Sequence, residues 1–201
     1  MSEKKSLNSK SNTQKKQFRF SDSSLQAIDK IMTFYPPDRK QSAVLPLLAL
    51  AQEDNSGWLS KSAIECVAKK LSVAILRVYE VATFHTMFNL SPVGKHSIEV
   101  CGTIPCCLCS SEKILETCKQ ELNIDVGETT TDGQFTLKEV ECLGACVNAP
   151  VVKVNKQYFE DLSPERMKEI INKLRADERI PSGSQIARQG SAPLGYKKET
   201  I

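Results

Sequence analysis

Apolar residues recur every three or four positions between residues 18 and 92, and this period predicts short amphipathic helices. Serines, prolines and a glycine interrupt the pattern, so we expect four helices with brief links between them. The expected boundary residues are Ser21 or Asp22 and Pro36 for the first helix, Ser42 and Gly57 for the second, Ser60 for the third, and Ser72 and Phe88 for the fourth. Four helices of this length predict a small helical bundle.

The pattern changes after residue 92, where strand-like runs alternate with two helical segments. Helices are predicted at residues 111–122 and after Ser163, where Ser-Pro-Glu supplies a cap, a proline at the first position and an acid in the first turn. Strands are predicted at residues 97–100, 135–140, 151–154 and 157–160. This order predicts a small mixed sheet with helices packed on it, which is the thioredoxin-like plan.

The fold class is therefore α+β or α/β, with an N-terminal helical bundle followed by a thioredoxin-like domain. Residues 1–17 are rich in Lys, Ser and Asn, with too little apolar content to order themselves. The expected parts are a disordered arm at 1–17, the bundle at 18–92, the thioredoxin-like domain at 93–180 and an irregular C-terminal tail at 181–201. By analogy with thioredoxin-like folds, we also expect a cis bond before Pro150.

Composition narrows the functional classes. A net charge of +3 on 201 residues, with a pI near 8.4, does not favour a nucleic-acid partner. The longest apolar run, residues 43–51, is far shorter than the ~20 residues of a membrane-spanning helix, and no signal peptide or mitochondrial presequence pattern is evident. We expect a chain without a membrane span in a reducing compartment, where its eight cysteines are ligands or buried thiols rather than disulfides.

Two close cysteine pairs carry the candidate chemistry. Cys101 and Cys106 follow the first predicted strand, and Cys142 and Cys146 follow the second. If these strands are neighbours in one sheet, the two loops converge and present four thiolates to a common point. Such a set is typical of an iron–sulfur cluster or a zinc ion, and the wide C-x4-C spacing favours a bridging two-iron unit.

Two further cysteines leave alternatives open in the first loop. Cys101, Cys106 and Cys109 fit the C-x4-C-x2-C spacing of plant-type ferredoxins, and Cys106 with Cys109 also forms the C-x-x-C of thiol oxidoreductases. Neither alternative explains Cys142 and Cys146. We expect Cys107 and Cys109 to be packing or surface residues rather than ligands.

The C-x4-C loop followed by a C-x3-C loop resembles the thioredoxin-like [2Fe–2S] ferredoxins. Residues 57–60 (GWLS) and 77–84 (RVYEVATF) resemble the N-terminal domain of one branch of that family, the E subunit of NADH:quinone oxidoreductase, or respiratory complex I. The likeness covers roughly residues 18–175. It implies a [2Fe–2S] cluster whose ligands are Cys101, Cys106, Cys142 and Cys146.

The resemblance also implies a function and partners. The chain would be an electron-transfer subunit of the NADH dehydrogenase module of a respiratory chain, with a cluster that exchanges single electrons with FMN in a partner. The implied partners are the FMN- and NADH-binding flavoprotein subunit and a neighbouring iron–sulfur subunit. The implied location is the cytoplasmic side of a bacterial inner membrane, with the mitochondrial matrix side as the alternative.

The sequence contains no Rossmann or Walker glycine motif, so we expect neither NADH nor flavin to bind this chain alone, and no catalytic residue of its own. Two alternative functions stay open. One is the equivalent subunit of an NAD-linked hydrogenase or formate dehydrogenase. The other is a thioredoxin-like thiol oxidoreductase that uses Cys106 and Cys109.

Overall fold

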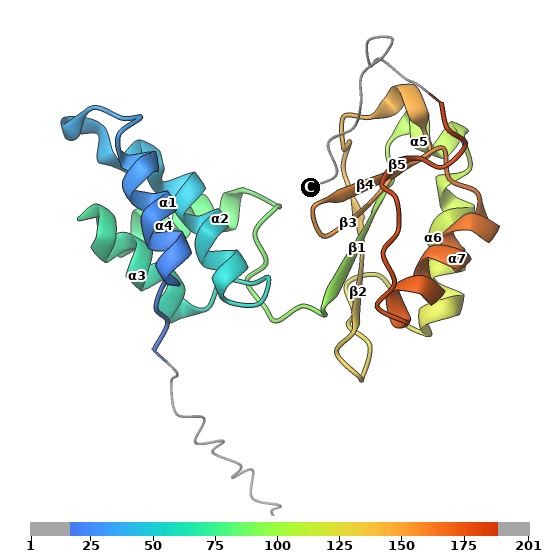
Figure 1. The fold of residues 1–201 in the computed structure, drawn as a ribbon, viewed down its shortest axis with the longest axis horizontal. Coiled ribbons are helices and arrows are strands. Elements are labelled where there is room, and N and C mark those ends of the chain that lie inside the picture. The colour runs from blue at the N-terminus through green and yellow to red at the C-terminus, as the bar shows by residue number, and fades with distance from the viewer. Residues whose placement is uncertain (1–16, 189–201) are drawn as a thin grey trace, which may run out of the picture. The chain divides into compact units, whose positions relative to one another are not determined.

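The computed structural model describes residues 17–188, which form two compact units that divide between Pro92 and Val93 (Figure 1). Each unit has its own buried apolar core. The expected N-terminal arm, apart from Gln17, and residues 189–201 of the expected tail lie outside the described residues. The combination of a helical unit with a mixed sheet confirms the α+β class.

The first unit is a small bundle built from amphipathic helices. Its α-helices are α1 (Asp22–Met32), α2 (Val44–Asp54), α3 (Lys61–Leu71) and α4 (Ile75–Phe84), and a 3-10 helix, η1 (Pro37–Ala43), joins the first two. The core between them includes Leu47, Ile64 and Val78, all of which are buried. Burial of these residues explains the helical period of the sequence, because each helix turns one apolar stripe inward.

Two of the predicted helix starts are confirmed by their caps. The Ser21 hydroxyl accepts a hydrogen bond from the Ser24 N–H at the start of α1, and the Ser60 hydroxyl accepts one from the Ala63 N–H at the start of α3, both at 3.2 Å. These bonds satisfy amide groups that have no partner within the helix.

The prediction that Ser72 caps α4 was wrong. Ser72 instead ends α3 in a left-handed conformation (φ 56°), and α4 begins three residues later, after Ala74. The Val73 N–H closes the end of α3 by donating to the Ala68 carbonyl, so this serine serves the helix before it. The expected extension of α4 to Phe88 was also wrong, because the backbone becomes extended at His85.

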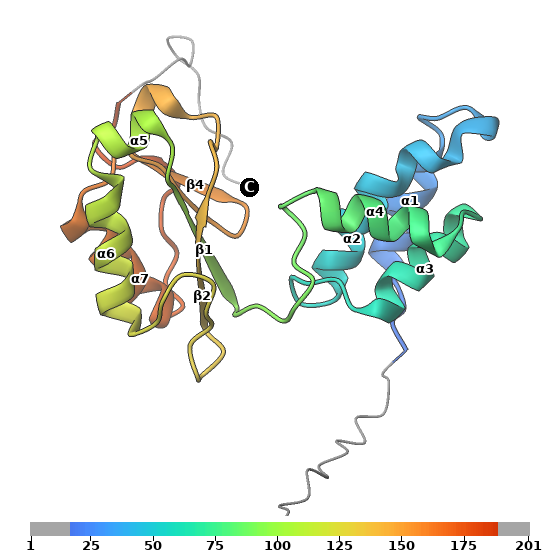
Figure 2. The same cartoon turned by 180° about the vertical axis from the view of Figure 1, so that it is seen from behind.

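The second unit is a five-stranded mixed sheet with two long helices on one face (Figures 1 and 2). The strand order is β2-β1-β3-β4-β5, with β1 parallel to β2, β4 parallel to β5, and the two central pairs antiparallel. The strands are β1 (His96–Cys101), β2 (Phe135–Val140), β3 (Val152–Val154), β4 (Gln157–Glu160) and β5 (Gly183–Ser184). The helices are α5 (Ile104–Leu108), α6 (Ser111–Leu122) and α7 (Pro164–Arg175), with a 3-10 turn, η2 (Cys146–Asn148).

Alternate residues of the strands separate an apolar face from a polar one. Ile98, Leu137 and Val152 belong to the core that the sheet shares with α6 and α7. On the other face, the Lys153 ammonium pairs with the Glu99 carboxylate at 2.6 Å. The alternation of apolar and polar residues along the strands therefore indicates which face of the sheet the helices cover.

Most predicted elements of this unit are confirmed, including the limits of α6 and β2 and the Ser163 cap of α7. The Ala149–Pro150 bond is cis, as the fold analogy suggested. The expectation of an irregular tail from residue 181 was wrong in part, because Gly183–Ser184 forms β5 beside β4. A two-residue strand is too short to produce a periodic signal in the sequence.

Gly94 packs against the first residue of β2, and this contact yields a test. A Cβ added at Gly94 would lie 2.7 Å from the backbone N and C of Phe135, which cannot shift without disturbing the pairing of β1 with β2. We expect Gly94→Ala to lower the free energy of unfolding of the second unit by about 1–3 kcal/mol, the usual cost of overpacking. Urea titration followed by circular dichroism measures the loss.

Gly102→Ala is the matched control for this substitution. A Cβ added there would meet the flexible end of the Glu139 side chain, 2.4 Å from Oε1, and that side chain can rotate away. We expect a loss of no more than about 0.5 kcal/mol, as for other surface changes. Equal losses for the two variants would contradict the argument from backbone contact.

Candidate functional site

The two cysteine loops leave the same edge of the sheet. Because β1 and β2 are parallel neighbours with Cys101 opposite Val140, their carboxyl ends lie side by side. The first loop continues into α5, and the second continues through Cys142 into η2. Figures 1 and 2 both show α5 beside η2 at this end of the unit. The pairing of two strands therefore brings together segments that are about forty residues apart in the chain.

Cys101 and Cys106 form a buried pair of thiols at the base of the site. Both side chains are buried, and each thiol affects the pKa of the other. Burial and the Cys101 side chain raise the pKa of Cys106 to about 12. Burial also opposes ionisation of Cys101, but hydrogen bonds from Thr103 and the Leu143 amide outweigh it and lower the pKa of Cys101.

Cys142 and Cys146 form a second, exposed pair, with their sulfur atoms 3.4 Å apart. The backbone N–H of Gly144 donates to the sulfur of Cys142 at 3.4 Å and lowers its pKa. Gly144 has a φ of 80°, a left-handed conformation that folds the loop back over its own cysteine. The hydrogen bond with Cys142 raises the pKa of Cys146. Each pair thus contains one sulfur that favours the thiolate and one that holds the proton.

The hydroxyl group of Thr103 connects the two pairs. It lies 3.2 Å from the sulfur of Cys101, and it also helps to lower the pKa of Cys142. One small side chain therefore affects the pKa of a cysteine from each loop. Sequence reasoning did not identify Thr103, because nothing in the sequence distinguishes it from other loop residues; only the spatial meeting of the two loops gives it this position.

The remaining cysteines do not join this group. The thiol of Cys107 donates to the Gly102 carbonyl at 3.1 Å, and Cys109 is exposed at the end of α5. Cys118 is fully buried in the core of the second unit, where burial raises its pKa to about 12, and Cys66 is half-buried in α3. No cysteine within the described residues forms a disulfide.

The sulfur pairs can be compared with the spacing that thiolates on a metal require. Within residues 17–188, no three or more His, Cys, Asp or Glu side chains are grouped so as to hold one metal ion. Two thiolates on one tetrahedral metal, with bonds of about 2.3 Å, lie about 3.8 Å apart, and the exposed pair already approaches that separation. Two such pairs meeting at one edge suit a [2Fe–2S] unit, in which each iron takes two thiolates.

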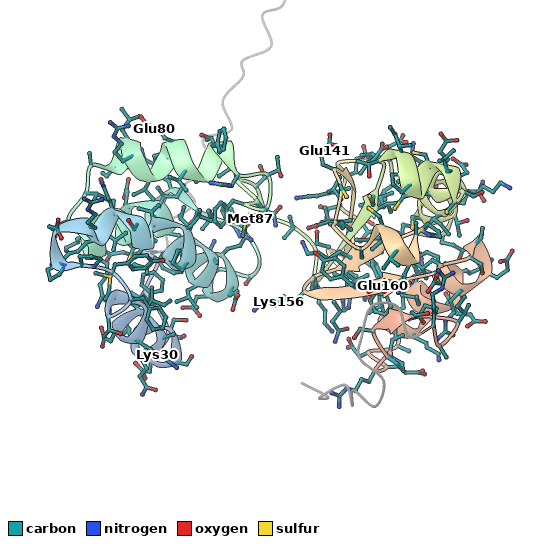
Figure 3. All side chains as sticks on the ribbon, turned by 90° about the horizontal axis from the view of Figure 1, so that it is seen from above. Lys30, Glu80, Met87, Glu141, Lys156 and Glu160 are labelled. Carbon is teal, nitrogen blue, oxygen red and sulfur yellow. The ribbon has the colours of Figure 1, made fainter. Side chains whose placement is uncertain are left out.

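The rim of the site combines apolar and acidic side chains. Ile104 and Leu108 on α5 and Val147 on η2 are large apolar residues exposed beside the cysteines. Glu141, labelled in Figure 3, is exposed at the periphery of the second unit and directly precedes Cys142. An apolar rim around a polar site is typical of a surface that a partner covers.

Comparison with known proteins adds family membership to this geometry. Residues 28–175 match the family model of the thioredoxin-like [2Fe–2S] ferredoxins. The chain belongs to this family. Curated relatives include the E subunits of the NADH-quinone oxidoreductases of Rickettsia bellii, 55% identical, and Rickettsia conorii, 52% identical. Each alignment covers 83% of this chain and 99% of the relative, so the chain belongs to the E-subunit branch of the ferredoxin family.

A solved structure supports the fold of this ferredoxin. An NAD⁺-reducing [NiFe]-hydrogenase in its H2-reduced state resembles it with a TM-score of 0.57 and 20% identity. The match covers 67% of this chain but only 22% of the hydrogenase chain, and at this identity it shows the fold alone. Among the described residues, no helix has both the length and the apolar character needed to cross a membrane.

The position of Thr103 predicts a change in thiol chemistry in the metal-free protein. Thr103→Val keeps the shape of the side chain but removes the hydroxyl that lowers the pKa of both Cys101 and Cys142. We expect both pKa values to rise, so that alkylation of Cys142 at a given neutral pH becomes slower because less thiolate is present. Alkylation rates across a pH series, followed by mass spectrometry of the cysteine peptides, measure the shift.

Thr117→Val is the control, because the Thr117 hydroxyl donates to a backbone carbonyl of α6 and contacts no cysteine. It should leave the Cys142 profile unchanged. An unchanged profile in Thr103→Val would show that the hydroxyl does not stabilise the thiolates.

Proposed function

We propose that this chain is the electron-transfer subunit of the NADH dehydrogenase module of respiratory complex I, and that it carries a [2Fe–2S] cluster. The meeting of Cys101 and Cys106 with Cys142 and Cys146 at one edge of the sheet carries the proposal. The names of the curated relatives support the assignment to a quinone-linked enzyme rather than to a hydrogenase or formate dehydrogenase.

We further propose that these four cysteines are the cluster ligands. The hydrogen bond between Cys142 and Cys146 supports this, as does the burial of Cys101 together with Cys106. Thr103 also lowers the pKa of one cysteine in each loop. We leave Cys107 and Cys109 out of the set. The Cys107 thiol is directed to the Gly102 carbonyl, and Cys109 is not among the groups that shift the pKa values of the four cysteines. Ligation requires deprotonation, which means that loading releases the protons held by Cys106 and Cys146.

The thiol oxidoreductase alternative is disfavoured by the state of Cys106. In a C-x-x-C enzyme a reactive cysteine must be accessible and must have a lowered pKa. Cys106 is buried, its pKa is raised to about 12, and the thiol that contributes to this rise is Cys101 rather than Cys109. These properties suit a ligand that is shielded from solvent.

When bound, a [2Fe–2S] cluster takes up and gives back one electron at a time. The part of this chain is to hold the sulfurs and to balance their charge. The Gly144 amide and the Thr103 hydroxyl donate to sulfur, which stabilises added negative charge, and burial of the first pair keeps water from one side of the site. The Glu139 side chain lies against Gly102 in the first loop and opposes added negative charge.

The two-electron chemistry of NADH belongs to a partner in this proposal. NADH delivers a hydride, so a flavin must stand between it and a one-electron carrier. We propose that FMN and NADH bind a flavoprotein subunit of the same complex, which contacts this chain together with a neighbouring iron–sulfur subunit. This places the chain in the peripheral arm on the cytoplasmic side of a bacterial inner membrane, with the mitochondrial matrix side as the alternative.

The surface of α4 in the first unit is the proposed docking face for the flavoprotein. Leu76 and Phe84, on one side of the helix, are 69 and 81% exposed, although the unit has a buried core of its own. Apolar side chains this exposed on one short helix are typical of a surface that is covered in an assembly. A subunit of an electron-transfer complex needs such a contact in addition to the rim of its metal site.

The ligand assignment predicts the outcome of a cysteine series. We expect Cys101→Ser, Cys106→Ser, Cys142→Ser and Cys146→Ser each to lose or grossly perturb the cluster, because each removes one of four sulfurs. Cys109→Ser is the matched control and should retain it. Visible absorption, iron content and EPR of the reduced proteins provide the measurement. An intact signal in Cys142→Ser with a lost signal in Cys109→Ser would favour the plant-type spacing instead.

If NADH and FMN bind only the flavoprotein subunit, the isolated chain should keep its cluster but should not be reduced by NADH at a useful rate. Addition of the FMN-containing partner should permit reduction of the cluster by NADH. The bleaching of its visible absorption, recorded by stopped flow, measures the rate. We expect Leu76→Lys to keep the cluster and to slow this partner-dependent bleaching, because it places a charge on the α4 docking face.

Val126→Lys is the matched control, since it adds the same charge at an exposed apolar residue of the second unit, in the segment between α6 and β2, which belongs neither to α4 nor to the cysteine loops. Rapid bleaching by NADH without flavin or partner would show that this chain has a dehydrogenase site of its own, and the proposal would fail.

A further inference from the structure

The segment after β5 returns to the second cysteine loop and is fastened there by Arg188. One nitrogen of the Arg188 guanidinium, Nη1, donates to the Val147 carbonyl at 3.1 Å, and the other, Nη2, lies 3.0 Å from Oδ1 of Asp161. Val147 follows directly on Cys146. The guanidinium thus joins the peptide next to a proposed ligand to an acid at the end of β4.

Asp161 is the anchor of this contact. Its carboxylate is only 3% exposed, and its second oxygen accepts a hydrogen bond from the Ser184 hydroxyl at 2.6 Å. Its backbone N–H donates to the Asn148 carbonyl in η2 at 2.8 Å. A carboxylate buried to this degree requires a charged partner, and Arg188 is the cation that the described residues supply.

The segment that leads from β5 to Arg188 contains an unfavourable backbone conformation. Ala187 adopts a left-handed conformation (φ 58°), which is unfavourable for a residue with a Cβ. The Arg188 N–H donates to the Ser184 hydroxyl at 2.9 Å, and the Gln185 N–H donates to the Glu160 carbonyl at 2.9 Å. Such a conformation persists where surrounding contacts hold it, and here those contacts direct Arg188 toward η2.

We propose that Arg188 is a positioning residue that holds the second cysteine loop in its metal-binding shape by joining Val147 to Asp161. The proposal rests on the proposed function in one respect, namely that Cys146 is a ligand. The planar guanidinium suits this position because its two nitrogens reach two acceptors at once, whereas a lysine ammonium is a single point charge.

The same contact places a positive charge one residue from a proposed ligand. Reduction of a [2Fe–2S] centre adds negative charge, so a nearby cation favours the reduced form. Arg188 therefore has two separable effects, one on the order of the loop and one on the reduction potential. A lysine in its place keeps the charge but not the bridge, and a glutamine keeps neither.

The test compares Arg188→Gln and Arg188→Lys in the full-length protein by hydrogen exchange. The Asn148 and Ala149 amides bond within the loop, to Ala145 and Cys146, and report its opening. We expect both variants to exchange at these amides about tenfold faster than the unsubstituted protein, the effect of losing one charge-assisted hydrogen bond. We also expect faster loss of iron to a chelator in both, and a lower reduction potential in Arg188→Gln than in Arg188→Lys.

Lys119→Gln is the matched control, because it also removes a positive charge and an ion pair, here with Asp125. Lys119 lies in the last turn of α6, at the end of that helix that is distant from the first cysteine loop. It should change neither the exchange of the loop nor the rate of iron loss. Core amides of α6 and α7 should also exchange at unchanged rates in all variants.

Unchanged exchange at Asn148 and Ala149 in both Arg188 variants would overturn the proposal. An equal rise in the core amides would also overturn it, because Arg188 would then affect the stability of the whole unit rather than the loop. A protein without iron or an EPR signal before any substitution would be a failure of the proposed function instead.

Discussion

The parallel pairing of β1 with β2 is the constraint on which the candidate site depends. The two strands pair over six residues, from His96 opposite Phe135 to Cys101 opposite Val140, and α6 makes the connection between them. Only this register places both cysteine loops at one edge. A slip of one residue would turn the buried side chains of a strand toward the polar face, so the apolar core and the candidate site depend on the same pairing.

The site that results is asymmetric. One cysteine pair is buried against the sheet, and the other lies exposed on a loop that folds over itself at Gly144. The buried pair is held by the backbone that carries it, because the Cys101 amide donates to the Val151 carbonyl. The loop of the exposed pair also receives a contact from a distant part of the chain, because the Arg188 guanidinium donates to the Val147 carbonyl. Such an arrangement shields one side of a redox centre and leaves the other open to a partner.

The polar groups around the sulfurs explain how a partly exposed site can carry negative charge. Each pair has a donor that lowers the pKa of one sulfur, the Thr103 hydroxyl in the first and the Gly144 amide in the second. Acidic side chains at the rim act in the opposite direction. The balance between these near charges and dipoles, rather than net charge, sets the electrostatic environment of the site, because the effect of a charge declines steeply with distance.

Local patterns in the sequence determined the elements and the candidate ligands. Features that depend on neighbouring residues were evident in the sequence. They are the limits of α6 and β2, the caps at Ser60 and Ser163, and the two cysteine pairs. Ser72 was misassigned, because a serine can end one helix as well as begin the next. Neither β5 nor the roles of Thr103 and Arg188 had a signal in the sequence. The Arg188 guanidinium meets the Val147 carbonyl across 41 residues, and contacts of that kind are decided by tertiary packing rather than by local propensity.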